Sequence, residues 1–350
     1  MAHVVKAEYL EDLCAAIFQK HGTPPEDART VARLLVEADL MGLHSHGTLR
    51  VPQYVGDIHQ GTIVPGAPLQ VTEQTPAAAL VDANWNFGQV GAARAAELAI
   101  EKARTLGLGC ASLRRCRHVG RVGAYTEQAA AAGCVAFAAC STAGEGHWVA
   151  PFGGREGRLG TNPLAFAAPT GGIPVSMDFA TSALPEGRVR YYRDTNQPLP
   201  PDSLVDKDGA PTLDPNALYA PQRQALGAIL PFGGPQGYKG FGLGLMAQVL
   251  SSLLGVPAWM EEGLEANGNN VWILAIDVQR FMTAERFRAE LNGLIDYIRS
   301  SAPVQGSKGV LMPGQREFEL LAQRQREGIP LEDGVWSQVR QSAEEAGVRI

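Results

Sequence analysis

The sequence predicts a mixed α and β fold in which helices flank a mixed sheet, and two observations carry this prediction. Residues 92–107 read as an alanine-rich helix that leads into a strand at 108–115, and residues 124–133 and 135–140 repeat that order. With 350 residues, 45% of them hydrophobic, the chain can also bury a substantial core. Further strands are expected at 174–180 and 271–277, and further helices near 240–254 and 283–300.

The first part of the chain predicts two amphipathic helices and then a loop. Residues 6–20 place Leu10, Leu13, Ile17 and Phe18 on one helical stripe. A capping box of Thr23, Pro24 and Glu26 is expected to open the second helix, which should end at Gly42. The stretch MGLHSHGTLRVPQYV (41–55) therefore lies at a helix-to-loop junction, where side chains can converge on a site. Residues 191–222 are rich in Pro and Asp and are expected to form an excursion or linker rather than core.

Charge and motif content exclude several classes of protein. A net charge of -6 leaves no basic surface for nucleic acid. The apolar run at 241–256 is too short for a membrane span, and the N-terminal residues lack the apolar run of a signal peptide, so the expected location is the cytoplasm. There is no P-loop motif. Gly242, Gly244 and Ala247 fit G-x-G-x-x-A, but no hydrophobic strand precedes them, so a Rossmann fold is not expected.

Polar side chains are embedded in several glycine-rich segments of the chain. The stretch 41–55 supplies His46, a side chain that exchanges protons near neutral pH, and Arg50, whose planar fork can bind both oxygens of a carboxylate. These two residues share a face if the backbone between them is helical. His118 follows a predicted strand, and similar polar and glycine-rich segments occur at 146–169, 177–182 and 233–242. Glycine permits close backbone approach to a ligand, so the pattern suits a large polar small molecule.

The order of these segments, SHG, RHVGRVG, APFGGRE, RLGTNP, DFATS, GYKGFGL and MPG, resembles the malate/L-lactate dehydrogenase family of the second type over nearly the whole chain. The segment from GRVR to PLPPDSLVDKDGAPTLDP is most similar to the 2-hydroxycarboxylate dehydrogenases. The resemblance implies a non-Rossmann, L-sulfolactate-dehydrogenase-like fold that interconverts a 2-oxo acid and a 2-hydroxy acid with NAD or NADP. It also implies a homodimer with a small anionic substrate.

We expect two units in such a chain. Residues 1–75 and 305–350, from the two chain ends, are predicted to form a smaller, mainly helical domain. Residues 76–304 are predicted to form the mixed-sheet domain that holds cofactor and substrate.

The family's functional positions match individual residues of this chain. Ser45 and His46 match a proton relay, and His118 matches a proton acceptor named in other relatives, so either histidine is a candidate for exchanging the substrate proton. Arg50 matches a carboxylate ligand and Thr161 a substrate contact. The positions that match cofactor contacts are Ser141, Asp178, Phe179, Ala180, Lys239, Pro313 and Gly314.

Three other interpretations stay in view. His44 and His46 could bind a metal, but the sequence offers no third ligand nearby and the relatives need none, so no metal site is expected and His44 is interpreted as structural. Family members that reduce cyclic imino acids of the delta-1-piperideine-2-carboxylate type carry an acidic residue after a glycine, where this chain has Arg188 after Gly187. A cation there suits an anionic oxo acid better. A non-catalytic, cofactor-binding relative is the third alternative.

Overall fold

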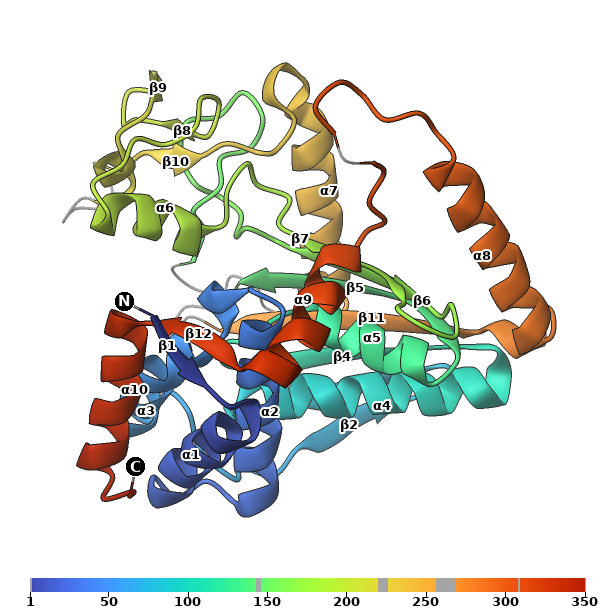
Figure 1. Cartoon of the computed structure of the whole chain (residues 1–350), viewed down its shortest axis with the longest axis horizontal. Helices are drawn as coiled ribbons and strands as arrows, with labels where there is room; N and C mark the ends of the chain where they lie inside the picture. Colours follow the sequence, from blue (N-terminus) through green and yellow to red (C-terminus); the bar gives the residue numbers. More distant parts are fainter. Residues whose placement is uncertain (1, 143–145, 220–225, 256–267, 308, 350) are drawn as a thin grey trace.

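The computed structural model describes residues 2–142, 146–219, 226–255, 268–307 and 309–349. Within these residues, seven strands form one sheet in the order β2-β3-β4-β11-β5-β6-β7 (Figure 1). In it β3 and β4 run parallel, and the other described neighbours run antiparallel, which confirms the predicted mixed sheet. The strands are β2 (Gln70–Gln74), β3 (Ala78–Asp82), β4 (Leu108–Cys116), β5 (Cys134–Thr142), β6 (Leu164–Ala168), β7 (Val175–Phe179) and β11 (Asn269–Asp277).

Helices cover both faces of this sheet. Figure 1 shows α4 (Gly88–Leu106) below the sheet and α7 (Tyr238–Gln248) above it. Along β5, Ala136 and Ala138 pack toward α4 and α5 (Gly123–Ala131), whereas Phe137 and Ala139 face α7. The alternation follows from the two-residue period of a strand, and the many alanines let helix and sheet pack closely.

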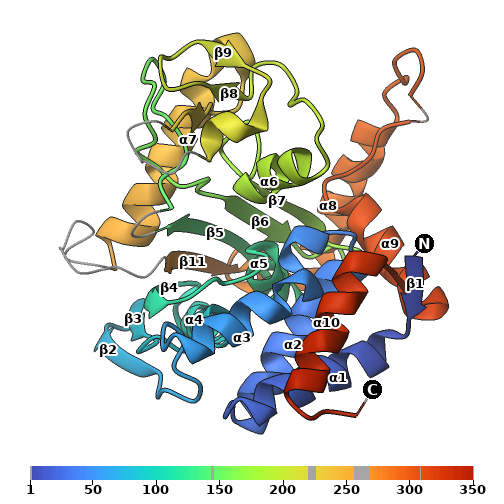
Figure 2. The ribbon, with the colours of Figure 1, turned by 90° about the vertical axis from the view of Figure 1, so that its left-hand side faces the viewer.

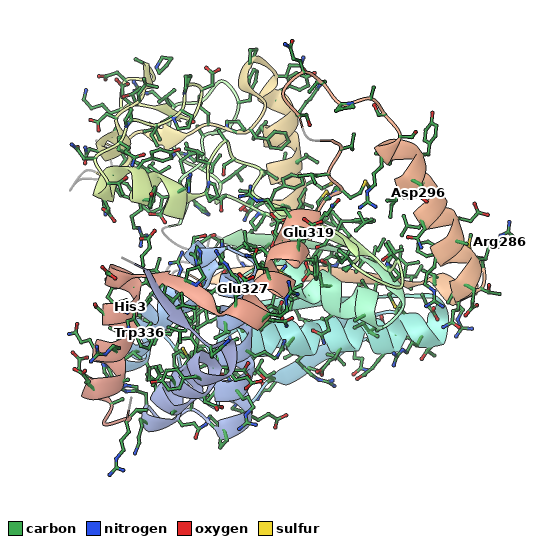
Figure 3. The ribbon with its side chains drawn as sticks, in the orientation of Figure 1. His3, Arg286, Asp296, Glu319, Glu327 and Trp336 are labelled. Carbon is green, nitrogen blue, oxygen red and sulfur yellow. The ribbon has the colours of Figure 1, made fainter. Side chains whose placement is uncertain are left out.

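The two chain ends form a second, helical layer. α1 (Ala7–Lys20), α2 (Pro25–Leu40), α3 (Val51–His59) and α10 (Asp333–Glu345) share one core, and α9 (Gln315–Glu327) packs against it through Leu321. β1 (Ala2–Val5) pairs antiparallel with β12 (Ile329–Glu332) and joins the ends. Figure 3 shows His3 and Trp336 next to each other at this junction, with ring centroids 6.4 Å apart.

The predicted two-unit division stays a prediction. The chain ends do share a core, but β2 lies before the proposed boundary at residue 75 and hydrogen bonds within the seven-stranded sheet.

The segment after β7 folds into a small lobe of its own. It contains α6 (Glu186–Asp194) and, in its described part, a sheet of β8 (Leu204–Val205), β9 (Pro211–Thr212) and β10 (Ala228–Ile229). The lobe stands above the helical layer in Figure 2. Buried residues of this lobe include Val189, Leu199 and Leu204, so the expectation that residues 191–222 contribute no core was wrong for the described part, residues 191–219. Short apolar residues spaced irregularly between prolines give no periodic signal, although they pack together here.

The other predicted elements agree closely with the structure, apart from one cap. The capping box was wrong: α2 begins at Pro25 after the extended Pro24, and the buried Thr23 hydroxyl caps nothing. A residue before proline is pushed into extended conformation, which makes Pro24 the N-cap residue. In the described residues the remaining elements are α8 (Ala284–Arg299), a π-helical turn (Val249–Leu253) and 3-10 turns at His44–His46, Thr48–Arg50, Pro215–Leu218, Gly234–Gln236 and Val278–Arg280.

The candidate dinucleotide motif lies inside a helix. Gly242, Gly244 and Ala247 all belong to α7, so they do not form a turn between a strand and a helix. In the described ranges, none of the helices is long and apolar enough to cross a membrane.

Candidate active site

The loop that carries Ser45 and His46 is fixed from below by Asp39 of α2. One carboxylate oxygen of Asp39 accepts hydrogen bonds from the Thr48 amide (2.8 Å) and hydroxyl (2.6 Å), and the other lies 2.7 Å from Nδ1 of His44. Gly47 is required at the point of closest approach, because a β-carbon there would lie 2.2 Å from the carboxylate. His44 also lies 3.3 Å from Arg324 of α9, so its contacts are those of a structural residue, as interpreted from the sequence.

Ser45, His46 and Arg50 lie together, but they do not share a helix. His44–His46 and Thr48–Arg50 form two separate 3-10 turns, and Gly47 between them is extended. The condition under which His46 and Arg50 would share a helical face is therefore not met. A hydrogen bond of 2.7 Å from Arg50 Nε to the Ser45 carbonyl holds the arginine beside the turn instead. The Ser45 hydroxyl lies 3.0 Å from Nδ1 of His46.

The fold brings His118 onto His46. The two rings are nearly parallel, with an interplanar angle of 19° and centroids 5.6 Å apart. His118 lies two residues after Cys116, the last residue of β4, and Gly88 at the start of α4 packs on the backbone there, where a β-carbon would lie 2.2 Å from the Arg117 carbonyl. Both rings are half-buried, so each keeps an edge that a small molecule can reach.

Both histidines favour the neutral form. Burial, together with the guanidinium groups of Arg50 and Arg121, lowers the pKa of His46 to about 4. Burial and the nearby Arg50 also lower the pKa of His118 well below its ordinary range. Arg121 is itself held by Glu37 (2.7 Å) and by Glu127 (2.6 and 2.8 Å). The site is thus a neutral imidazole pair beside fixed positive charge, although the chain as a whole is acidic.

The sequence did not identify two further residues in contact with the site. The Tyr54 hydroxyl lies 2.7 Å from Nδ1 of His118, and Nε2 of Gln89 donates a 2.7 Å hydrogen bond to the same hydroxyl. Tyr54 was visible as part of the 41–55 cluster. Gln89 lies on α4, and nothing in its local sequence marks it.

Most of the predicted cofactor residues gather around the end of β7, the edge strand of the sheet. Asp178 accepts a 2.7 Å hydrogen bond from the Gly123 amide, and the exposed ring of Phe179 contacts Phe232 with centroids 6.1 Å apart. Pro313 accepts a 3.2 Å hydrogen bond from the Ser176 amide, which brings Pro313 and Gly314 beside the same strand. Ala180 precedes Thr181, whose amide donates to the Thr161 carbonyl at 3.0 Å.

Lys239 belongs to the same neighbourhood. It stands exposed in the first turn of α7, and the next residue, Gly240, packs so closely that a β-carbon there would lie 3.0 Å from the Thr181 carbonyl. The Lys239 ammonium lies 5.9 Å from the centre of the Tyr238 ring.

Ser141 is placed differently from the other predicted cofactor residues. It is fully buried, and its hydroxyl lies 2.7 Å from the hydroxyls of both Ser251 and Ser252. A cofactor contact at this residue would therefore use the main chain rather than the side chain.

The lobe that contains α6 approaches the histidine loop. A β-carbon on Gly187 would lie 3.8 Å from Nη2 of Arg50 and 3.8 Å from the β-carbon of Ser45. The following Arg188 places its guanidinium over the rings of Tyr191 and Tyr192, at 5.2 and 5.3 Å. The first turn of α6 therefore bounds the space beside Arg50.

A cavity of about 560 Å³ lies between α8, α9 and the turn that joins β6 to β7. Asp296 of α8 and Glu319 of α9, both labelled in Figure 3, line it. Its described lining includes Pro313 but neither His46 nor His118, so the cavity adjoins the predicted cofactor region rather than the histidine pair.

Comparison with known proteins identifies the family of this chain. Residues 5–340 match the model of a family described as malate/L-lactate dehydrogenase. The chain belongs to the malate/L-lactate dehydrogenase family. It is 33% identical to L-sulfolactate dehydrogenase of Methanocaldococcus jannaschii, over 99% of this chain and 98% of that protein. Membership of this family places the chain among the dehydrogenases and confirms the resemblance seen in the sequence motifs.

Solved structures of proteins with similar sequences share this fold. Malate dehydrogenase from Pyrococcus horikoshii superposes with a TM-score of 0.87 at 30% identity and covers 99% of this chain and 97% of its own. Delta1-piperideine-2-carboxylate reductase from Pseudomonas syringae pvar. tomato reaches a TM-score of 0.81 at 30% identity, with 97% of this chain and 100% of that chain covered.

Proposed function

We propose that this protein is an NAD(P)-dependent dehydrogenase that interconverts a 2-hydroxy acid and a 2-oxo acid. The observation that carries the proposal is the stacked pair His46 and His118, with Arg50 held beside it. A neutral histidine can accept the hydroxyl proton, and an arginine can bind and orient the carboxylate. The names of the relatives, which act on sulfolactate and malate, support a small anionic substrate of this class.

The residues around β7 fit a nicotinamide dinucleotide. The exposed Lys239 offers a cation for the phosphates, and Asp178, Phe179 and Ala180 offer a carboxylate, an exposed ring and a small residue at one strand end. Pro313 and Gly314 lie against the same strand. A nicotinamide held by these residues would supply or accept the hydride of the reaction.

The protein's own groups account for the remaining chemistry of this proposal. Arg50 would bind the carboxylate, and the Thr161 segment would close the site from the side of β7. One histidine of the pair takes the hydroxyl proton as the hydride leaves C2, and returns a proton when the oxo acid is reduced. The positive charges of Arg50 and Arg121 disfavour a further positive charge on the histidines, so the histidine pair stays neutral until an anionic substrate binds.

Purified protein with NADH or NADPH and a panel of 2-oxo acids tests the proposal. We expect oxidation of at least one of the two cofactors with at least one 2-oxo acid, and the reverse reaction with the matching 2-hydroxy acid. Absence of turnover in both directions, with binding of the cofactor retained, would instead favour a non-catalytic binding protein.

A second candidate, reduction of a cyclic imino acid, is favoured by the similarity to the Pseudomonas reductase. Arg188 stands against it, because it follows Gly187, which lies beside Arg50, and a cation at this position disfavours a positively charged iminium. Cyclic imines belong in the same panel, and a higher kcat/KM for an imine than for every 2-oxo acid would reverse the order of the two candidates.

We also propose that the enzyme acts as a homodimer in the cytoplasm. Exposed apolar side chains gather on α7 and the π-helical turn after it, including Leu245, Val249 and Leu254. Contiguous exposed apolar side chains commonly mark protein interfaces. Analytical ultracentrifugation tests the dimer, and a single species at the 37.2 kDa mass of one chain would exclude it.

A further inference from the structure

Tyr54 occupies a buried position directly behind His118. Its side chain is fully buried, and its ring packs against Phe18 and Phe87, with centroids 6.3 and 6.0 Å away. The hydroxyl at the end of this ring lies between two polar groups, Nε2 of Gln89 and Nδ1 of His118, each at 2.7 Å. Gln89 is also fully buried. A buried phenol or amide group is costly unless it is hydrogen bonded. The Tyr54 hydroxyl and Nε2 of Gln89 are paired in this way, whereas Oε1 of Gln89 has no partner among the described residues.

The chemistry of the three groups gives this chain of hydrogen bonds a direction. The amide nitrogen of Gln89 can only donate, so the Tyr54 oxygen accepts from it. The phenol has a single proton, which is then free for His118. Nδ1 of His118 must therefore be the acceptor, and the proton of the neutral ring must be on Nε2.

We propose that Gln89 and Tyr54 are positioning residues that hold His118 as the neutral tautomer protonated on Nε2. The role of this tautomer in the reaction rests on the proposed function, but the assignment of the tautomer itself does not. In this tautomer His118 offers an N–H to the substrate oxygen. It cannot also take up a proton at Nδ1 without losing the hydrogen bond from Tyr54.

The same argument separates the roles of the two histidines, which the sequence left open. The partner of His46 at Nδ1 is the Ser45 hydroxyl at 3.0 Å, and a serine hydroxyl can rotate to donate or to accept. His46 can therefore gain and lose a proton while keeping this hydrogen bond. It follows that His46 exchanges the substrate proton, and His118 stabilises the charge that develops on the substrate oxygen.

Histidine NMR reads the tautomer directly and needs no turnover. In protein labelled with 15N-histidine, long-range 1H–15N spectra distinguish a protonated from an unprotonated ring nitrogen, and comparison with His118→Asn assigns the signals of His118. We expect wild-type His118 to carry its proton on Nε2. A proton on Nδ1 would overturn the proposal, whether or not the protein proves to be a dehydrogenase.

Two variants and a matched control test the positioning role. Tyr54→Phe keeps the ring but removes the hydroxyl, so His118 should become a mixture of tautomers and its pKa should rise. Gln89→Met, which removes the donor at similar volume, should have a smaller effect in the same direction. Tyr125→Phe is the control: Tyr125 is also a buried phenol, but its hydroxyl donates to the Val119 carbonyl.

Kinetics then connect the tautomer to the reaction. Tyr54→Phe should lower kcat on the best 2-oxo acid by ~10- to 100-fold, since a misplaced catalytic group costs about that much, with an unchanged dissociation constant for the cofactor. Tyr125→Phe should keep kcat within about twofold and leave the His118 tautomer unchanged. If Tyr54→Phe kept the Nε2 tautomer and lost no more kcat than the control, the positioning role would be wrong. If the tautomer changed as expected but no variant or wild-type protein turned over, only the proposed function would fail.

Discussion

Arg50 donates a 2.7 Å hydrogen bond from Nε to the carbonyl of Ser45, the residue before His46. The positive charge of Arg50 also lowers the pKa of His46. Its Nη1 donates to Gln53 at 2.6 Å. Nε thus ties the guanidinium to the histidine loop and Nη1 ties it to α3, whereas Nη2 faces the first turn of α6. Through this arrangement one side chain fixes the loop and can offer a directed cation to a substrate.

This arrangement predicts that lysine cannot replace Arg50. Arg50→Lys keeps a charge but loses the fork, so we expect kcat/KM for a 2-oxo acid to fall ~100-fold, and to fall further in Arg50→Ala. The amide of the same acid, which lacks the carboxylate, should be affected much less. Equal losses for acid and amide would show that Arg50 only anchors the loop. Arg94→Lys, an exposed arginine on α4 that pairs with Glu97, is the control.

The pKa of His46 gives a second prediction. Because burial and Arg50 lower this pKa to about 4, NMR titration should show His46 neutral at pH 6, where an ordinary histidine is mostly protonated. Arg50→Gln removes a nearby positive charge, so the pKa of His46 should rise, whereas Arg94→Gln should not change it. A wild-type pKa near 6.5 would contradict the inferred electrostatics.

The same shift predicts how stability depends on pH. The folded-state pKa lies below the unfolded value of ~6.5, so the unfolded chain binds more protons between these pH values. The free energy of unfolding should therefore be fully retained above about pH 6.5 and fall as the pH drops toward 4. His46→Asn removes this contribution. Urea unfolding at pH 7.5 and pH 5 should show a smaller loss in the variant, and an equal loss in both would exclude a contribution from His46.

Much of the fold could be predicted because its signals are local. The helix-then-strand order at 92–115 and 124–140 corresponds to α4, β4, α5 and β5, with boundaries shifted by a few residues. The lobe around α6 could not be predicted, because its small core joins Val149 to Ile229 across a stretch without periodicity. The order of the strands could not be predicted either, because β11 comes from a distant part of the chain and lies between β4 and β5.

The candidate site divides in the same way. His46, Arg50 and His118 were found through their motifs, and the fold brings the two histidines together. Gln89 could not be found, because its role depends on a contact with Tyr54 that only the packing of α4 against α3 creates.

Lys239 supports a further prediction about the cofactor. It is exposed in the first turn of α7 beside the end of β7, and a helix N-terminus with a lysine suits phosphate groups. Lys239→Ala should raise KM for the cofactor ~10-fold or more and change KM for the 2-oxo acid much less. Lys20→Ala, an exposed lysine at the end of α1, is the control. A larger rise in KM for the 2-oxo acid than for the cofactor would indicate that Lys239 contacts the substrate instead.

Asp39 should control the histidine loop without touching the substrate. It is 1% exposed, and its carboxylate receives the Thr48 amide and hydroxyl and lies against His44. In Asp39→Asn one of the two oxygens becomes an NH2 group, which then faces either the donors of Thr48 or Nδ1 of His44, so the buried side chain loses at least one of its hydrogen bonds. Because an unpaired buried polar group costs ~1 to 3 kcal/mol, the free energy of unfolding should fall by about that amount. The loop should also lose its fixed position, so kcat should fall ~10-fold or more.

Two comparisons separate these effects of Asp39. Thr48→Val removes only the hydroxyl contact and should cost ~1 kcal/mol with a smaller change in kcat. Asp12→Asn, at an exposed site on α1, should change neither quantity. Cofactor affinity should stay the same in all three variants, because the predicted cofactor residues lie around β7 rather than on this loop. If Asp39→Asn lost stability but kept its kcat at a temperature well below its Tm, the carboxylate would serve folding alone. The position of His46 would then depend on Arg50 and Ser45 instead.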